Sequence, residues 1–340
     1  MGRTVKDLTE SNDLKTVPSE YVFPTNPEEV EEAEQQIPII DYHLLTSGSP
    51  DQRSQIIENL RIACLDWGFF MVINHGVAES LINEMMNLCL SFFDLSPDEK
   101  SDYVGKDVLN PIRCGTSFNT SVENVYFWRD YLKVLVHPDF HAPLKPNAFR
   151  NISYEYCKRT REVAKELVNA ISESLGLQGD YIEKALETKS GLQILIVNLY
   201  PPCPQPELAM GMPPHSDHGL LTLLAQNEIG GLQIKHKGKW IVANALPNSF
   251  MVNIGDHMEI LSNGKYKSIL HRVAVNTKAT RVTVVTANGP SLDAVVTPAP
   301  DLVDSENYTP LYRGMKYREY VELQQSNQLD RKSCLDRIRV

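Results

Sequence analysis

The sequence has no long apolar run. No stretch approaches the ~18 apolar residues that a helix needs to cross a bilayer, and residues 1–15, MGRTVKDLTESNDLK, lack the apolar centre of a secretory signal peptide. Gly2 follows Met1, but Lys6 stands where the myristoylation pattern requires Ser or Thr. We therefore expect a protein without a membrane span or a lipid anchor.

Cysteine and positive charge are also scarce. The six cysteines show neither paired zinc-type spacing nor disulfide density, a pattern typical of a reducing compartment, so we expect a cytoplasmic protein. The 33 Lys and Arg against 43 Asp and Glu give a formal net charge of −10. Nucleic acid is therefore not an expected partner, because phosphate binding requires concentrated Lys and Arg. The one basic run, at 235–239, is interpreted as a solvated turn.

The composition is that of an ordinary globular protein, with 42% apolar and 22% charged residues. The polar, acidic first 35 residues predict a loosely ordered arm that ends in a short helix within the run EEVEEAEQQ. Apolar periodicity then predicts a sequence of helices and strands. We expect strands at 37–41 and 69–74, helices at 51–67, 78–93 and 154–175, a helix start at 96–100, and a closing helix after about 315.

Between Leu192 and Ala287 the pattern changes to short strands rich in Ile, Val, Leu and Thr, separated by Gly, Pro and Asn turn signals. Strands at such intervals predict a sandwich or barrel of antiparallel sheet. We find no internal repeat. The expected organisation is an arm (1–35), a helical and mixed region (36–145), a long support helix (146–190), a β core (191–292) and a C-terminal helical segment (293–340).

The triplet His215-Ser216-Asp217 is the most informative motif. In an extended strand, residues i and i+2 point to one face, so an imidazole and a carboxylate would converge on one point. The apolar run ILHRV supplies a third ligand, His271. Two His and one carboxylate leave open positions and suit oxygen-activating Fe(II), but zinc hydrolases use the same set, so the ligands leave the metal open.

A second motif, Arg281-Val282-Thr283, discriminates between these metals. Arg281 and Thr283 again share a face of a strand, and together they can bind a carboxylate through bidentate, charge-assisted hydrogen bonds. A dicarboxylic keto acid could chelate the metal at one end and be anchored at the other. Zinc hydrolases need no such anchor. Each motif alone is common by chance, and only their order and spacing together carry the interpretation.

Three polar residues near these motifs are expected to play other roles. His218 follows the triplet at i+3 and would face away from His215 in a strand, so we do not predict it as a ligand. His257 is expected to be a structural residue near the site, and Asp256 to make turn or network hydrogen bonds.

The sequence resembles the plant family of 2-oxoglutarate- and Fe(II)-dependent dioxygenases, in particular its flavone synthase and salicylate hydroxylase branch. The resemblance runs from Ile37 to Leu329 as a long ordered series. It includes IPIID at 37–41, DWGFFMVINHGV at 66–77, WRDYLK at 128–133, NLYPPCPQPE at 198–207, PHSDHGLLTLLAQ at 214–226, VNIGD at 252–256 and LSNGKYKSILHRV at 261–273.

The resemblance implies a mainly β fold with surrounding helices, a distorted double-stranded β-helix of the jelly-roll or cupin-like type. It also implies that Asn198 and Tyr200 contact the cosubstrate beside Arg281 and Thr283, and that O₂ and ascorbate take part. Tyr200 could equally be a core aromatic residue. The sequence departs from the family at Thr283, where Ser is usual, and at Ala287, where many relatives have an aromatic residue. The second departure argues against a flavonoid-stacking pocket.

The expected activity is the oxidation of a small metabolite, by hydroxylation, demethylation or desaturation, coupled to decarboxylation of 2-oxoglutarate to succinate. Two alternatives remain: an Fe(II) oxidase that uses an external reductant instead of 2-oxoglutarate, and an inactive scaffold used for binding. An acidic surface without heptads favours a monomer. The candidate substrate contacts, carried over by position, are Tyr131, Lys133, Ile196, Ala287 and Asn288.

Overall fold

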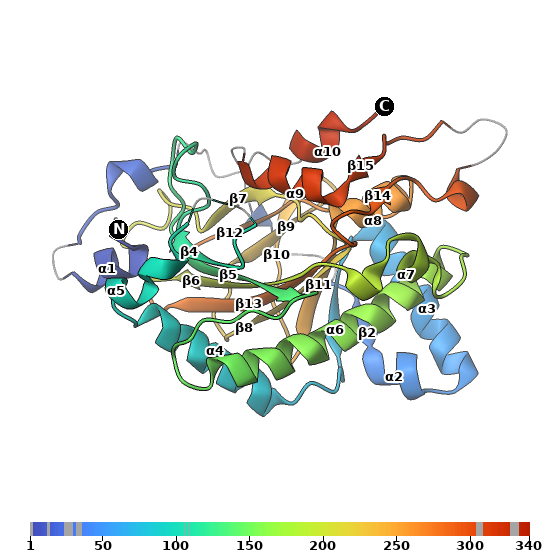
Figure 1. Ribbon diagram of the computed structural model, residues 1–340, viewed down its shortest axis with the longest axis horizontal. Helices are drawn as coiled ribbons and strands as arrows, with labels where there is room; N and C mark the ends of the chain where they lie inside the picture. Colours follow the sequence, from blue (N-terminus) through green and yellow to red (C-terminus); the bar gives the residue numbers. More distant parts are fainter. Residues whose placement is uncertain are drawn as a thin grey trace.

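Two sheets form the centre of the molecule (Figure 1). The computed structural model describes residues 3–11, 14–23, 30–31, 36–105, 107, 109–303, 309–326 and 333–340. The larger sheet contains, in spatial order, β2 (Ile39–Asp41), β3 (Phe69–Ile73), β11 (Phe250–Ile254), β8 (Leu221–Gln226), β13 (Arg281–Asn288), β6 (Gln193–Tyr200), β5 (Asp130–His137) and β4 (Ile112–Thr116). The smaller contains β1 (Val30–Glu31), β10 (Lys239–Val242), β9 (Leu232–His236), β12 (His271–Val273) and β7 (Met212–His215).

Helices pack outside these sheets, which agrees with the expected mainly β core and surrounding helices (Figure 1). They are α1 (Val5–Glu10), α2 (Tyr42–Ser47), α3 (Pro50–Asp66), α4 (Glu79–Phe93), α5 (Pro97–Lys100), α6 (Phe149–Ser174), α7 (Tyr181–Ala185), α8 (Asp256–Leu261), α9 (Tyr317–Ser326) and α10 (Ser333–Arg337). A short pair, β14 (Val295–Val296) with β15 (Met315–Lys316), precedes α9. No helix among the described residues is long and apolar enough to cross a membrane.

Local sequence explains where several helices begin. Ser49 caps α3 by accepting a hydrogen bond from the Gln52 backbone N–H, and the Gln52 side chain accepts one from the Ser49 backbone. Ser96 and Glu99 form the same reciprocal box at α5. Such a box satisfies two otherwise unpaired N–H groups, and in both helices a proline in the first turn adds a preset φ. The predicted helices at 51–67 and 96–100 are therefore confirmed.

The alternation of side chains along the central strands separates a core from a cavity. On β13, Val282 and Val284 point into the main apolar core, against α4 and α6. Arg281 and Thr283, at the intervening positions, line a cavity between the two sheets. The same period of two operates on the neighbouring strand β6. Its core-facing side chains are Leu195, Val197 and Leu199, and its cavity-facing side chains are Ile194, Ile196, Asn198 and Tyr200.

The structure corrects some expected elements. The arm carries its helix near its start, as α1, whereas the described part of the acidic run, Val30–Glu31, forms a strand parallel to β10; residues 32–35 lie outside the described residues. The hairpin of β4 and β5 was not predicted, because its strands mix charged and apolar residues without clear alternation. Helix α6 begins at Phe149, earlier than expected. The larger sheet also takes strands from outside 191–292.

Candidate active site

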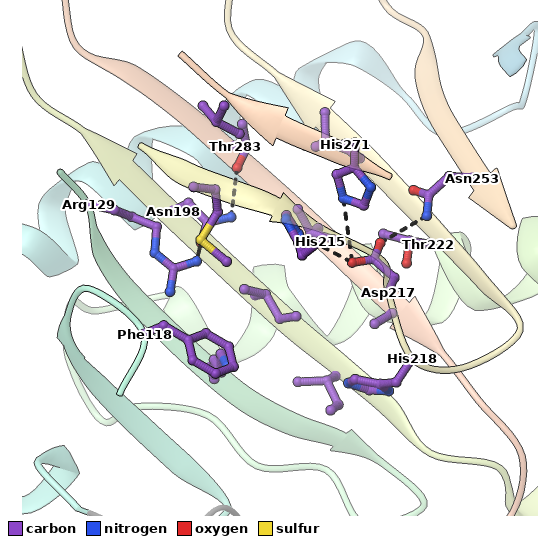
Figure 2. Close-up of a pocket in the computed structure, with 18 of the residues that line it drawn as sticks. Phe118, Arg129, Asn198, His215, Asp217, His218, Thr222, Asn253, His271 and Thr283 are labelled. Atoms are coloured by element: carbon purple, nitrogen blue, oxygen red, sulfur yellow. Dashed lines mark hydrogen bonds and ion pairs between the residues drawn. The ribbon is translucent and has the colours of Figure 1, made fainter. Parts of the chain in front are cut away.

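Three side chains converge on one point inside the cavity (Figure 2). His215 is the last residue of β7 and His271 the first of β12, and the two are register partners in the antiparallel pair. Asp217 Oδ1 lies 3.7 Å from His215 Nε2 and 3.6 Å from His271 Nε2. All three ligand atoms lie within 4.8 Å of one another, a spacing that could hold a metal ion.

Backbone and side-chain partners fix these ligands. His215 Nδ1 lies 2.8 Å from the Pro213 carbonyl oxygen, and His271 Nδ1 lies 3.2 Å from that of Ile269. A carbonyl oxygen can only accept, so Nδ1 carries the proton in each ring and Nε2 presents its lone pair to the cluster. Asn253 Nδ2 donates to Asp217 Oδ2 at 2.9 Å.

The protonation states also suit a metal. Burial, together with the neighbouring His271, lowers the pKa of His215 below its usual value. Burial acts to raise the pKa of Asp217, but the two imidazoles and the Asn253 hydrogen bond lower it below its usual value. At neutral pH the cluster therefore offers a neutral His215 imidazole and an ionised carboxylate.

Asp217 does not lie on the same strand as His215. The predicted shared strand face is therefore wrong, although the two side chains do converge. Strand β7 ends at His215, and Asp217 lies in the following loop. The Asp217 carbonyl oxygen accepts a hydrogen bond of 2.8 Å from the Asp256 backbone N–H at the start of α8. This loop geometry still brings Asp217 to the two histidines, because α8 holds the loop in place.

At one end of the cavity, Arg281 is almost fully buried, with 1% of its surface exposed. Its Nη2 donates to Gln226 Oε1 at 2.9 Å, and its guanidinium carbon lies 5.2 Å from the centroid of the Tyr200 ring. Nε and Nη1 are buried without a hydrogen-bond partner among the described residues. Because unpaired buried donors are costly, this guanidinium fits an anionic ligand such as a carboxylate.

Thr283 belongs to a chain of hydrogen bonds beside Arg281. Asn198 Nδ2 donates to Thr283 Oγ1 at 3.1 Å, and Asn198 Oδ1 accepts from Arg129 Nη1 at 3.1 Å (Figure 2). Arg129 is held in turn by the Ser117 carbonyl oxygen, to which its Nη2 donates at 2.6 Å. We call Arg281, Thr283, Asn198, Tyr200 and Arg129 the anchor end of the cavity. Arg129 was not predicted, although it lies in the quoted WRDYLK motif.

Comparisons with known proteins agree with this geometry. Residues 191–290 match the 2OG-Fe(II) oxygenase superfamily, and residues 37–154 match the N-terminal family of the non-haem dioxygenase in morphine synthesis. The chain is 48% identical over 307 residues to 2-oxoglutarate-dependent dioxygenase 19 of Oryza sativa subsp. japonica, covering 90% of this chain and 91% of that protein.

The chain belongs to the plant 2-oxoglutarate- and Fe(II)-dependent dioxygenase family.

Other similar proteins also agree with the assignment to this family. Thebaine 6-O-demethylase of Papaver somniferum is 36% identical, covering 96% of this chain and 93% of that protein. The crystal structure of JOX2 in complex with 2OG, Fe and JA superposes with a TM-score of 0.89 at 31% identity, covering 99% of this chain and 98% of that one. The expected jelly-roll fold is thereby confirmed. The dioxygenase uses Fe(II) and 2-oxoglutarate, with O₂ and ascorbate as for the family.

The candidate substrate contacts divide into two groups. Lys133, Ile196 and Ala287 line the cavity of the dioxygenase. Tyr131 and Asn288 are not among the residues that line this cavity, and their role as substrate contacts stays a prediction. The Tyr131 ring packs close to Gly115 on β4. The Asn288 amide is used inside the sheet, where Oδ1 accepts from Gln193 Nε2 at 3.1 Å.

The other end of the cavity is also basic. Arg113 on β4 and Lys133 on β5 are register partners, and both line the cavity with Phe118. We call Arg113 and Lys133 the basic pair. Gln325 of α9 accepts hydrogen bonds from both, at 2.8 Å from Lys133 Nζ and 3.4 Å from Arg113 Nη2. The sequence interpretation did not include Arg113, because its position opposite Lys133 depends on the unpredicted β4–β5 pairing.

The structure places His218 in the loop after β7 and on the cavity wall, not on a strand facing away from His215 as predicted. His218 is not part of the cluster of possible metal ligands, and its Nδ1 lies 2.7 Å from the Tyr317 hydroxyl of α9. Asp256 accepts a hydrogen bond of 2.6 Å from the Tyr320 hydroxyl. The buried His257 ring packs edge-on against Tyr317. Helix α9 is therefore tied to the loop that carries Asp217.

Proposed function

We propose that His215, Asp217 and His271 hold Fe(II) in this dioxygenase, and that Arg281 and Thr283 hold the distal carboxylate of 2-oxoglutarate, with Asn198 and Tyr200 as further contacts. The observation that carries this proposal is the buried Arg281 guanidinium, whose Nε and Nη1 have no partner among the described residues. An enzyme of this fold that used an external reductant in place of 2-oxoglutarate would need no such anchor. An inactive scaffold would need neither the anchor nor the cluster of ligands.

The chain's own residues would orient and protect the reactants. Bound Fe(II) supplies the activation of O₂ that couples substrate oxidation to decarboxylation of 2-oxoglutarate. Asn253 would hold the Asp217 carboxylate with one oxygen toward the metal position. Arg281 would fix the far end of the cosubstrate, since a bidentate guanidinium sets orientation as well as affinity. The buried apolar walls would exclude water from the reaction.

The dioxygenase oxidises a small-molecule metabolite, and we propose that it acts in plant specialised metabolism. Proteins similar to this chain bear the names of different reactions, such as Flavanone 3-dioxygenase 2 and Thebaine 6-O-demethylase. Hydroxylation is the reaction that we propose first, with demethylation as the alternative where the attacked carbon is an O-methyl or N-methyl group. Desaturation would follow the same hydrogen abstraction from a substrate without either group.

We further propose that the enzyme works as a monomer in the cytoplasm. The six cysteines are all free and buried in the structure, which fits a reducing compartment. The net charge of −10 opposes self-association. Size-exclusion chromatography with light scattering tests the monomer, and a fluorescent fusion tests the compartment.

Anaerobic titration of the purified protein with Fe(II) and 2-oxoglutarate tests the proposed site. We expect the weak visible charge-transfer band of the metal-bound keto acid in the wild type, no band in Asp217→Ala, and a band that needs more 2-oxoglutarate in Arg281→Ala. A full band in Asp217→Ala would contradict the proposed metal site. A wild type without the band would favour the oxidase that uses another reductant.

A further inference from the structure

The basic pair places two positive side chains opposite each other on an internal wall. Arg113 and Lys133 are direct register partners of β4 and β5, and both line the cavity. Only 9% of the Lys133 surface is exposed. Like charges directly opposite each other on a sheet are unfavourable, and buried charges are costly unless they are paired. Placing these two positive charges opposite each other therefore destabilises the fold, and their packing does not offset the lost stability.

No carboxylate among the described residues forms an ion pair with either member of the basic pair. Both instead share one neutral acceptor, the Gln325 side-chain oxygen. The Lys133 ammonium also lies 4.7 Å from the centroid of the Phe118 ring. The carboxylates of Asp107 and Asp217 attract the Arg113 and Lys133 charges, respectively, from a distance, without forming a salt bridge with them. Burial, with Arg113 and Arg129, lowers the pKa of Lys133 well below its usual value, and an anion beside this side chain would favour its charged form.

The basic pair and Arg281 lie on opposite sides of β6 and at different positions along it. On β6, Lys133 is paired with Ile196, whereas Arg281 is paired with Tyr200 from the other side. Four residues along a strand correspond to ~13 Å. A carboxylate bound by Arg281 would therefore lie about four strand residues along β6 from the level of the basic pair. His215 and Asp217 point into the space that these strands enclose (Figure 2).

We propose that the substrate of this dioxygenase is a small organic acid, whose carboxylate is bound by Lys133 and Arg113 and whose apolar body lies along Phe118, Ile196 and Val321. These three side chains line the same cavity. Two carboxylate oxygens match two donor groups that now share one amide oxygen. Ala287, also on the cavity wall, offers no ring for stacking a flat neutral substrate. This inference deepens the proposed function and rests on it.

Matched acids and amides test the inference without knowledge of the natural substrate. Protein loaded anaerobically with Fe(II) and saturating 2-oxoglutarate is titrated with benzoate and benzamide, cinnamate and cinnamamide, and 4-phenylbutyrate and 4-phenylbutanamide. Binding is followed by calorimetry and by the change in the charge-transfer band. We expect at least one acid to bind roughly tenfold or more tightly than its amide, because a buried charge pair strengthens binding by such amounts.

Variants assign this preference to the basic pair. Lys133→Met should weaken binding of the acid by roughly 30-fold or more and leave binding of the amide within about twofold. Lys133→Arg should keep the preference for the acid. Leu135→Ala, from the same strand and the same cavity wall, is the matched control and should weaken acid and amide alike.

Three results would overturn the inference: amides that bind as tightly as their acids, an unchanged acid preference in Lys133→Met, or no binding of any acid while the charge-transfer band is present. Absence of that band in the wild type would be a failure of the proposed iron and 2-oxoglutarate site instead. The two failures are therefore distinguished in one experiment.

Discussion

At the anchor end, Arg281 lies on β13 between β6 and β8 in the middle of the larger sheet, whereas the basic pair lies on β5 and β4, the last two strands of that sheet. Arg281 is buried by strands on both sides. Lys133 and Arg113 are instead covered by α9, a helix near the C-terminus, through Gln325. The part of the cavity proposed for 2-oxoglutarate is thus formed by central strands of the larger sheet. The part proposed for the substrate is built by a sheet edge and one helix.

The hydrogen bonds of the two ends differ in the same way. At the anchor end a chain runs from Thr283 through Asn198 to Arg129 and on to the Ser117 carbonyl oxygen. The basic pair has one amide acceptor, the side chain of Gln325. A site with fixed partners selects one ligand geometry, and a site with a displaceable partner can accept a ligand in its place.

Removal of a proposed metal ligand should lower the activity more than any other change. It should not distinguish the anchor end of the cavity from the basic pair. We expect Asp217→Ala to lower succinate release by roughly 10³-fold or more, because the metal contributes several kcal/mol to the reaction. The fold should remain, with a melting temperature within ~4 °C of the wild type. Full activity in this variant would contradict the assignment of Asp217.

Loss of the Asn253 side chain should weaken the proposed metal site less than loss of Asp217 itself. Asn253→Ala leaves Asp217 without the amide that holds its Oδ2, so we expect a ~10- to 100-fold lower affinity for Fe(II). Asn244→Ala, which removes an exposed amide, is the control. Equal Fe(II) affinities in the two variants would show that Asn253 does not orient the carboxylate.

Substitutions at Thr283 test the role of its hydroxyl separately from the role of its methyl group. In Thr283→Val the Asn198 amide loses its acceptor, so we expect a roughly 10-fold higher KM for 2-oxoglutarate. In Thr283→Ser the acceptor remains, and the KM should stay within about twofold of the wild type. Acid binding at the basic pair should be unaffected in both variants. A KM that responds equally to Ser and Val would mean that the hydroxyl plays no part.

A substitution at Tyr320 tests whether α9 supports the basic pair and not the anchor end. Tyr320→Phe removes a 2.6 Å hydrogen bond to the buried Asp256 carboxylate, and we expect the free energy of unfolding in urea to fall by ~1.5–3 kcal/mol. Because α9 carries Gln325, acid binding should weaken by a few-fold, with no change in the KM for 2-oxoglutarate. Tyr154→Phe, at an exposed position of α6, should change neither quantity. A raised KM in Tyr320→Phe would show that α9 supports both ends.

Local patterns in the sequence were sufficient for much of the fold. The helix start at 96–100, the periodicity of α4 and the apolar run of β3 depend on residues close together in the sequence, so they can be recognised without knowledge of tertiary structure. The alternation of Arg281 and Thr283 was recognised in the same way. The structure places both side chains in the cavity.

Features that depend on distant pairing were not accessible from those patterns. Arg113 and Lys133 meet only because β4 and β5 pair, and Arg129 reaches Asn198 from 69 residues away. Asp217 reaches the histidines through a loop fixed by α8, where the sequence predicted a strand. Tyr131 and Asn288, which were carried over by position alone, are not among the cavity-lining residues. Side-chain direction at such sites is set by register and packing.

The most direct test of the difference between the two ends is one anaerobic 2-oxoglutarate titration of the Fe(II)-loaded protein, made side by side for Arg281→Ala and Lys133→Met. We expect Arg281→Ala to need roughly 30-fold or more 2-oxoglutarate to form the charge-transfer band, while Lys133→Met titrates as the wild type does. A Lys133→Met curve that shifts as far as that of Arg281→Ala would show instead that the basic pair belongs to the cosubstrate site.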